Sequence, residues 1–300
     1  MSITPNNLSS KGICIDDTTA GVSAEKFNWP CLTSQPQFLR TYHYSEGVSA
    51  KGWIAYCVTN SIPVMVGLDL GSDNGQSDIN AFSADYLASP SEYDTNVISI
   101  AIGNEATSVS SMVTGITYAK TLQAAGKLPK NALITTVLAA AAQWFTNGST
   151  YPPASTTFSS DFKQLLPHLD VIAFNCYGGY FLEGDQGISL SNSLSWSSTS
   201  GSVLLNQFAA IRAAMSAAGS NLKFWCTETG WNSDPGNPSW SNLANLKTFY
   251  TNFLEYTINP TNSPDKIFYF SAKDVPGGQG GAGFGLYTAS GGWTSKIQSC

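Results

Sequence analysis

Apolar, β-branched and aromatic residues recur along the chain in eight short runs. The runs are Lys11–Ile15, Phe38–Tyr44, Pro63–Leu70, Val97–Gly103, Ala132–Ala139, Val171–Cys176, Lys223–Thr227 and Lys266–Ser271. Runs of this length and composition predict strands that are buried on both faces, as in a parallel sheet. Stretches with helical spacing lie between most of the runs, so the pattern predicts an α/β protein.

Three of the intervening stretches carry apolar residues three and four positions apart. They are Ser110–Gly126, Val203–Gly219 and Trp240–Thr257, and the first two end at a glycine, the expected stop of a helix. Eight strands alternating with helices predict one (β/α)8 TIM barrel that forms a single catalytic domain over residues 1–300. A doubly wound open sheet would also alternate strands and helices.

Two of the predicted strands stop at a glutamate. Val97–Gly103 leads through Asn104 to Glu105, and Lys223–Thr227 leads directly to Glu228. Packing does not explain either residue, because an unpaired buried carboxylate is costly. The two strands are the fourth and the seventh, and in a closed barrel their carboxyl ends face one cleft. The pattern therefore favours the barrel and predicts that two glutamates about 120 residues apart meet at its mouth.

A pair of carboxyl groups at such a site is suited to cleaving a glycosidic bond. One group protonates the leaving oxygen while the other stands on the far side of the anomeric carbon. If the two groups are about 5 Å apart, the second attacks directly and the configuration is retained. The alternative is that each glutamate only caps the end of its strand and is held there in an ion pair.

Composition and charge limit the cellular location and the binding partners that we expect. Only 11% of the residues are charged, so Ser, Thr, Asn, Gln and Gly supply the polar surface, which is more typical of secreted proteins. The net charge is −6 and Lys and Arg do not cluster, so we expect neither nucleic acid nor a membrane as a partner. A neutral polymer is compatible with this charge. No signal-peptide pattern follows Met1, which fits a mature terminus with an added Met.

The cysteines leave their pairing open. There are six: Cys14, Cys31, Cys57, Cys176, Cys226 and Cys300. None forms a CxxC pair and only His43 and His168 could complete a metal set, so we expect no metal and no other cofactor. Up to three disulfides are possible, although Cys176 and Cys226 lie in predicted strands and could equally be free buried thiols. We expect the terminal Cys300 to be bridged.

Five short motifs stand out along the chain. They are Arg40-Thr41-Tyr42, Gly103-Asn104-Glu105, Phe174-Asn175-Cys176-Tyr177, Thr227-Glu228-Thr229-Gly230-Trp231 and Phe284-Gly285-Leu286-Tyr287. In order and spacing they resemble glycoside hydrolase family 17, which contains β-1,3-glucanases and β-1,3-glucanosyltransferases. The resemblance runs from about Lys11 to the C-terminus. It implies a TIM barrel and a retaining enzyme that forms a covalent glycosyl-enzyme intermediate.

The resemblance also implies roles for single residues. Glu105 would be the catalytic acid/base and Glu228 the nucleophile. Asn104 would hydrogen-bond the 2-hydroxyl of the sugar in the cleavage subsite, a bond that can strengthen in the transition state. Tyr177 would donate its hydroxyl to Glu228, and Tyr42 would border the −1 or −2 sugar. Both tyrosines could instead serve only to pack the barrel.

Aromatic rings stack well on the apolar faces of sugars, and 12% of this chain is aromatic. Trp231 follows the second glutamate motif and is the best candidate for stacking on the substrate. Four other aromatic residues are weaker candidates, because aromatic side chains more often belong to the core. They are Trp144, Tyr180, Trp196 and Trp240.

One segment departs from the family pattern. The eighth strand in the family is commonly followed by an Asp/Asn-Glu pair with a lysine shortly after. Here the segment reads Lys273-Asp274-Val275, so a valine stands where the auxiliary glutamate would be. A reshaped acceptor side that holds a sugar better than water would favour glycosyl transfer over hydrolysis.

The first hypothesis is therefore a secreted or cell-wall monomer that hydrolyses or transglycosylates β-1,3-glucan polysaccharide or oligosaccharide. We expect its activity to follow a bell-shaped pH curve, because Glu105 must be protonated while Glu228 is ionised. A wall-associated β-glucan-binding protein with little turnover is the alternative from another class. A barrel hydrolase that acts on another β-glycan is a third reading.

Overall fold

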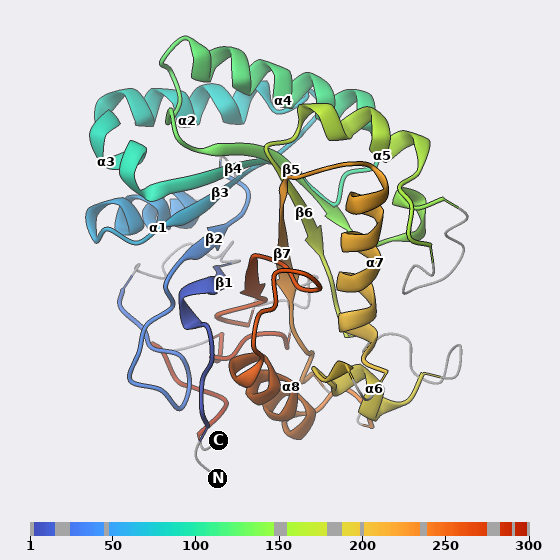
Figure 1. The fold of residues 1–300 in the computed structure, drawn as a ribbon. Helices are drawn as coiled ribbons and strands as arrows, with labels where there is room; N and C mark the ends of the chain where they lie inside the picture. Colours follow the sequence, from blue (N-terminus) through green and yellow to red (C-terminus); the bar gives the residue numbers. More distant parts are fainter. Residues whose placement is uncertain are drawn as a thin grey trace.

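A closed barrel of eight parallel strands forms the centre of the molecule (Figure 1). The computed structural model describes residues 3–15, 25–44, 48–146, 155–178, 188–198, 201–234, 239–274, 283–289 and 292–298. The strands are β1 (Lys11–Ile15), β2 (Leu39–Thr41), β3 (Val64–Leu68), β4 (Val97–Asn104), β5 (Leu133–Ala139), β6 (Val171–Asn175), β7 (Lys223–Thr229) and β8 (Lys266–Tyr269). Each strand pairs with its neighbours in sequence, and β1 closes on β8. The predicted TIM barrel is confirmed and the open sheet is excluded.

Helices cover the outside of the barrel (Figure 1). They are α1 (Val48–Thr59), α2 (Gln76–Ala88), α3 (Pro90–Asn96), α4 (Val109–Ala124), α5 (Ser160–Leu165), α6 (Leu190–Leu194), α7 (Val203–Ala217) and α8 (Leu243–Glu255). The three predicted helices correspond to α4, α7 and α8, each slightly shorter than expected. Across the described parts of the chain, no helix has the length and apolar character needed to cross a membrane.

Side-chain caps explain where the predicted helices begin. Ser108, Ser202 and Asn242 each accept a hydrogen bond from a backbone N–H in the first turn of α4, α7 and α8. Gly126 and Gly219, just beyond α4 and α7, adopt positive φ angles of 69° and 64°, which glycine tolerates best. The glycine stops predicted from the sequence are therefore confirmed.

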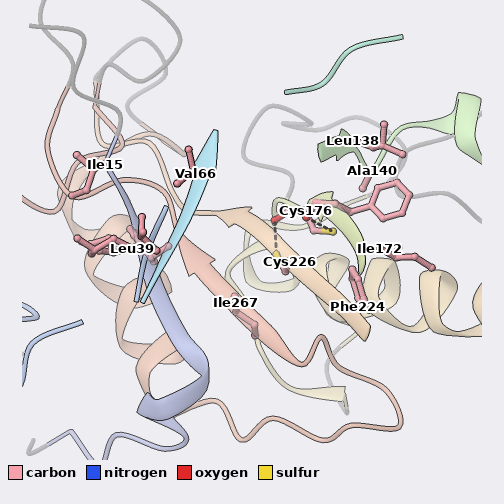
Figure 2. Packing of buried hydrophobic residues seen from close by; sticks show 14 of the residues in the cluster. Ile15, Leu39, Val66, Leu138, Ala140, Ile172, Cys176, Phe224, Cys226 and Ile267 are labelled. Atoms are coloured by element: carbon pink, nitrogen blue, oxygen red, sulfur yellow. Dashed lines mark hydrogen bonds between the residues drawn. The ribbon is translucent and has the colours of Figure 1, made fainter. Parts of the chain in front are cut away.

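The buried residues form two layers. An inner cluster fills the barrel, and an outer cluster lies between the strands and the helices, part of which is shown in Figure 2. Side chains alternate along each strand, so in β7 Trp225 belongs to the inner cluster while Phe224 and Cys226 belong to the outer one. This alternation decides which residues near a strand end can reach the barrel mouth.

Four of the cysteines are buried and form no disulfide: Cys14, Cys57, Cys176 and Cys226. Three disulfides are therefore excluded. Cys176, directly after β6, and Cys226, in the middle of β7, lie in the outer cluster (Figure 2). The Cys226 Sγ donates to the Glu228 carbonyl at 3.2 Å. Cys31 is not one of the free thiols. Cys300 lies outside the described residues.

Gly230 lies directly after β7, at a close approach to the backbone that follows β8. A Cβ added to it would stand 2.0 Å from the carbonyl oxygen of Phe270. Gly230→Ala must displace that backbone, and we expect it to lower the free energy of unfolding by about 1–3 kcal/mol. Chemical denaturation measures the difference.

Gly52 in α1 is the matched control for this substitution. A Cβ there meets nothing within 4 Å, so Gly52→Ala should leave stability unchanged or raise it by about 0.5–1 kcal/mol. Equal stability of the Gly230→Ala variant and the wild type would contradict the close approach.

Candidate active site

Two glutamates stand at the carboxyl ends of β4 and β7. Glu105 directly follows β4 with a φ of 54°, and its N–H donates to the Val137 carbonyl on β5 at 2.8 Å. The register of β4 on β5 shifts between Ala101 and Asn104, and that of β7 on β8 shifts between Cys226 and Thr229. Irregular pairing of this kind re-aims side chains next to active sites.

The Glu228 carboxylate is buried and accepts three hydrogen bonds from side chains. Its Oε1 accepts from Arg40 Nη1 at 2.9 Å and from the Tyr42 hydroxyl at 2.7 Å. Its Oε2 accepts from the Tyr177 hydroxyl at 2.6 Å. Three donors on two oxygens, one of them a guanidinium, form the environment of a carboxylate anion with a fixed orientation.

Arg40, on β2, connects Glu228 to the opposite side of the barrel mouth. Its side chain is buried, and its Nη2 donates to the Asn104 Oδ1 at 2.8 Å. Its Nη1 also donates to the Thr227 carbonyl at 2.8 Å and to the Asn175 Oδ1 at 3.2 Å. A buried charge needs such partners, so this arginine holds parts of β4, β6 and β7 in a fixed relation.

Glu105 faces the same site in a contrasting environment. Glu105 is exposed at the barrel mouth. Its Oε1 accepts from the Asn175 Nδ2 at 2.9 Å. The surrounding protein removes part of the hydration of this carboxyl, and Glu228 adds a like charge, so both raise the pKa of Glu105 above its usual 4.5. Asn175 and Arg40 thus link the two glutamates through three successive hydrogen bonds.

Five of the six residues predicted for the site come together here: Tyr42, Asn104, Glu105, Tyr177 and Glu228. The hydroxyls of both tyrosines bond directly to Glu228, so the reading of these residues as packing alone is excluded. The bond from Tyr177 to Glu228 has the predicted partners. Tyr42 makes a similar bond that the sequence reasoning did not include.

Trp231 does not belong to the site, and the prediction that it stacks on the substrate is wrong. Its side chain is 0% exposed and belongs to the outer cluster. Its Nε1 donates to the Trp240 carbonyl at 2.9 Å, and its ring stacks on that of Trp240. Beyond Gly230 the chain turns this ring away from the barrel mouth and into the layer beneath α8.

The weaker aromatic candidates belong to the core as well. Trp144, Trp196 and Trp240 are buried in the outer cluster, and Tyr180 lies outside the described residues. In the described part of the chain, no group of three or more His, Cys, Asp or Glu residues could hold a metal ion.

Two residues of the site received no role from the sequence: Arg40 and Asn175. Each is a polar side chain in or at the end of an apolar run, the same signal that singled out the two glutamates. Thr227 supports Asn175 by donating its Oγ1 to the Asn175 Oδ1 at 2.9 Å. A search for every buried polar residue in the predicted strands would have found all three.

The segment after β8 contains an ion pair. Asp274 accepts from the Lys296 Nζ at 2.8 and 2.9 Å, and this Nζ also donates to the Ser233 Oγ at 2.8 Å. Lys273 instead places its Nζ over the Trp293 ring, 4.9 Å from the centroid. A lysine close to the C-terminus therefore pairs with Asp274, and Val275 lies outside the described residues.

Two comparisons by sequence find no relative: no protein-family model and no curated protein matches the chain. Solved structures do match. An endo-laminarinase from Formosa Hel1_33_131 has a TM-score of 0.62 at 20% identity, over 84% of this chain and 74% of that chain. An active-site mutant of a Rhizomucor miehei β-1,3-glucanosyltransferase, in complex with laminaritriose, has a TM-score of 0.59 at 20% identity, over 88% and 87%.

A plant β-glucan endohydrolase is also similar, with a TM-score of 0.64 at 16% identity. The match covers 95% of this chain and 98% of that chain. At these identities the comparisons establish the shared barrel fold. One barrel fold hosts many functions, so the fold alone does not assign an activity to this chain.

Proposed function

We propose that this chain is a retaining glycosidase or transglycosylase that acts on β-1,3-glucan. The observation that carries the proposal is the contrast between its two linked glutamates. The Glu228 carboxyl group accepts three hydrogen bonds, one of them from a guanidinium, whereas the pKa of Glu105 is raised. Two carboxyl groups in such different surroundings can divide the roles of nucleophile and acid between them. The names of the similar structures, a laminarinase, a β-1,3-glucanosyltransferase and a β-glucan endohydrolase, supply the substrate class.

In the first step a Glu228 oxygen attacks the anomeric carbon and forms the glycosyl-enzyme ester. The glycosidic oxygen leaves with the proton of Glu105, so the departing sugar is neutral and Glu105 becomes a carboxylate. Tyr42, Tyr177 and Arg40 hold the nucleophile in place before the attack. Their fixed orientation reduces the reorganisation that the reaction requires.

In the second step Glu105 acts as a base. It takes a proton from water or from a sugar hydroxyl, whose oxygen attacks the anomeric carbon and releases Glu228. Water gives hydrolysis, and a sugar acceptor gives a longer glucan. Both outcomes use the same intermediate, so the loops that receive the acceptor determine the ratio of transfer to hydrolysis.

Asn104 is oriented to bind the sugar being cleaved. Its Oδ1 accepts from Arg40 at 2.8 Å and from the Asn175 Nδ2 at 3.1 Å, which fixes the direction of the amide. Asn104 is exposed, so its Nδ2 group is left to donate to a substrate, and the 2-hydroxyl of the sugar would accept. A hydrogen bond at that hydroxyl strengthens in the transition state.

The pH profile should follow the titration of Glu105. Because the pKa of Glu105 is raised, the protonated acid persists to higher pH than an ordinary glutamate, and kcat/KM should peak at acidic to mildly acidic pH. The hydrogen bond from Asn175 lowers this pKa, so Asn175→Ala should move the basic limb of the kcat/KM profile to higher pH. A limb that moves to lower pH, or a rate that climbs into alkaline pH, would contradict the assignment.

Product analysis with a defined β-1,3-linked oligosaccharide tests the proposed function. We expect shorter products from hydrolysis, longer ones from transfer, or both, and retention of the β configuration in the first product. Parallel incubations with β-1,4 and mixed-linkage oligosaccharides test the linkage. Binding of the β-1,3 oligosaccharide without any product would establish a glucan-binding protein instead, and turnover of β-1,4 linkages alone would establish another glycosidase.

We further propose a secreted or wall-associated setting and a monomeric enzyme that needs no cofactor. The low charged fraction supports the setting, since polar uncharged residues supply most of the surface.

A further inference from the structure

A cavity lies at the opposite end of the barrel from the two glutamates. Its volume is about 730 Å³, within the size range of small-molecule sites. The residues that line it come mainly from the amino-terminal ends of the strands and from the segments that precede them. They are Ser91, Asp94, Thr95, Val97, Ile98, Lys130, Asn131, Leu133, Lys223, Trp225 and Lys266.

Strand alternation places two of the lysines on the inside of the barrel. Lys223 and Trp225 are two residues apart in β7, and Trp225 belongs to the inner cluster. Lys266 stands in the same relation to Phe268 in β8. Trp225 and Lys266 are also direct partners in the register of β7 on β8. Both lysines are therefore the first inward-facing residues of their strands, where a barrel normally carries apolar side chains.

Neither ammonium group forms an ion pair among the described residues, although the charge of Asp265, which pairs with Arg212, raises the pKa of Lys266. Lys266 Nζ lies 4.1 Å from the ring centroid of Phe38 and 5.9 Å from that of Trp225. The one carboxylate that lines the cavity, Asp94, accepts from the backbone N–H of Lys130 at 2.9 Å and lies 3.7 Å from the Lys130 Nζ. The cavity thus carries three cations and one anion, in a chain with a net charge of −6.

Trp225 also lines the cavity. Its side chain is 2% exposed, and its buried Nε1 has no hydrogen-bond partner among the described residues. Burial and the like charge of Lys223 lower the pKa of Lys266 by more than Asp265 raises it. An anion beside this lysine would stabilise its charged form.

We propose that this cavity binds a small organic anion, of the size of a hexose phosphate, through Lys223 and Lys266. Ammonium groups are donors only, which selects an acceptor-rich phosphate or carboxylate group. Ser91, Thr95 and Asn131 supply polar contacts for a hydroxylated body, and Ile98 and Leu133 supply an apolar wall. The site is separate from the cleft and does not rest on the proposed function.

Isothermal titration with glucose 6-phosphate tests the site, with glucose as the neutral control and with citrate and inorganic phosphate as further anions. We expect glucose 6-phosphate to bind more tightly than glucose, and more weakly as ionic strength rises. Lys266→Gln should weaken binding about tenfold or more, the usual effect of losing a contact to a charged group. Lys163→Gln, at an exposed position of α5, should bind as the wild type does.

Binding of inorganic phosphate or citrate with the same dependence on Lys266 would also support the site and assign recognition to the anionic group. Lys223→Gln, at an exposed position, provides the test if Lys266→Gln does not fold. Equal affinity in the Lys266→Gln, Lys223→Gln and Lys163→Gln variants would overturn the proposal. Absence of binding by every anion, or displacement of the anion by laminaritriose, would overturn it as well.

Discussion

Glu228→Ala is expected to lower kcat on β-1,3-glucan by roughly 10⁴-fold or more, with no comparable loss of glucan affinity. Losing a covalent nucleophile has an effect of this order in other enzymes. The reason here is specific: the variant keeps Tyr42, Tyr177 and Arg40 but has no oxygen to attack the anomeric carbon. Steady-state kinetics on a laminari-oligosaccharide, with a separate binding titration, measures the two quantities.

The alanine variant leaves Arg40 without its carboxylate partner, and loss of one member of a buried ion pair is destabilising. Glu228→Gln therefore serves as a second variant, because the amide keeps the shape and one acceptor oxygen. Glu92→Ala, at an exposed position of α3, is the surface control and should retain full activity. A Glu228→Gln enzyme that folds and still turns over at more than a few per cent of the wild-type rate would exclude this residue as the nucleophile.

Glu105→Ala should reduce turnover of glucan by about 10²- to 10⁴-fold, the usual range for loss of a general acid–base group. The effect must depend on the leaving group. An aryl β-glucoside that leaves without a proton should still form the glycosyl-enzyme, and then release it slowly, because no base activates the water. Rapid-mixing kinetics should show a burst of the aryl alcohol followed by a slow steady rate.

Equal losses on the glucan and on the activated aryl glycoside would contradict the role of Glu105. Asn175→Ala is the useful comparison. Asn175 donates a hydrogen bond to Glu105, but its amide cannot act as the general acid or base. That variant should keep the acid/base chemistry and change its pH dependence, whereas Glu105→Ala should lose the basic limb of the profile.

The strands and the two glutamates could be predicted because each depends on local rules. An apolar run that ends in a carboxylate needs no knowledge of the rest of the chain, since the cost of burying the charge signals a special role. The position of Glu105 and Glu228 at one barrel mouth then follows from the count of strands, fourth and seventh.

Other features depend on contacts that only the folded chain shows. The buried face of α2 carries Asp78 and Ser83, which bond to the Asp69 N–H and to the Lys127 carbonyl, so this helix lacks a clean apolar stripe. Trp231 was misassigned because motif position does not tell which way a ring points after a glycine. Nor does spacing reveal that Arg40 joins three strands.

The configuration of azide products tests the central claim most directly. In Glu228→Ala, azide can take the space of the missing carboxylate and attack an activated β-1,3-glucoside opposite the leaving group, which predicts the α-glycosyl azide. In Glu105→Ala the glycosyl-enzyme still forms on Glu228 and azide attacks from the other face, which predicts the β-glycosyl azide. The same anomer from both variants, or the β-azide from Glu228→Ala, would show that these two residues do not flank one glycosidic bond as assigned.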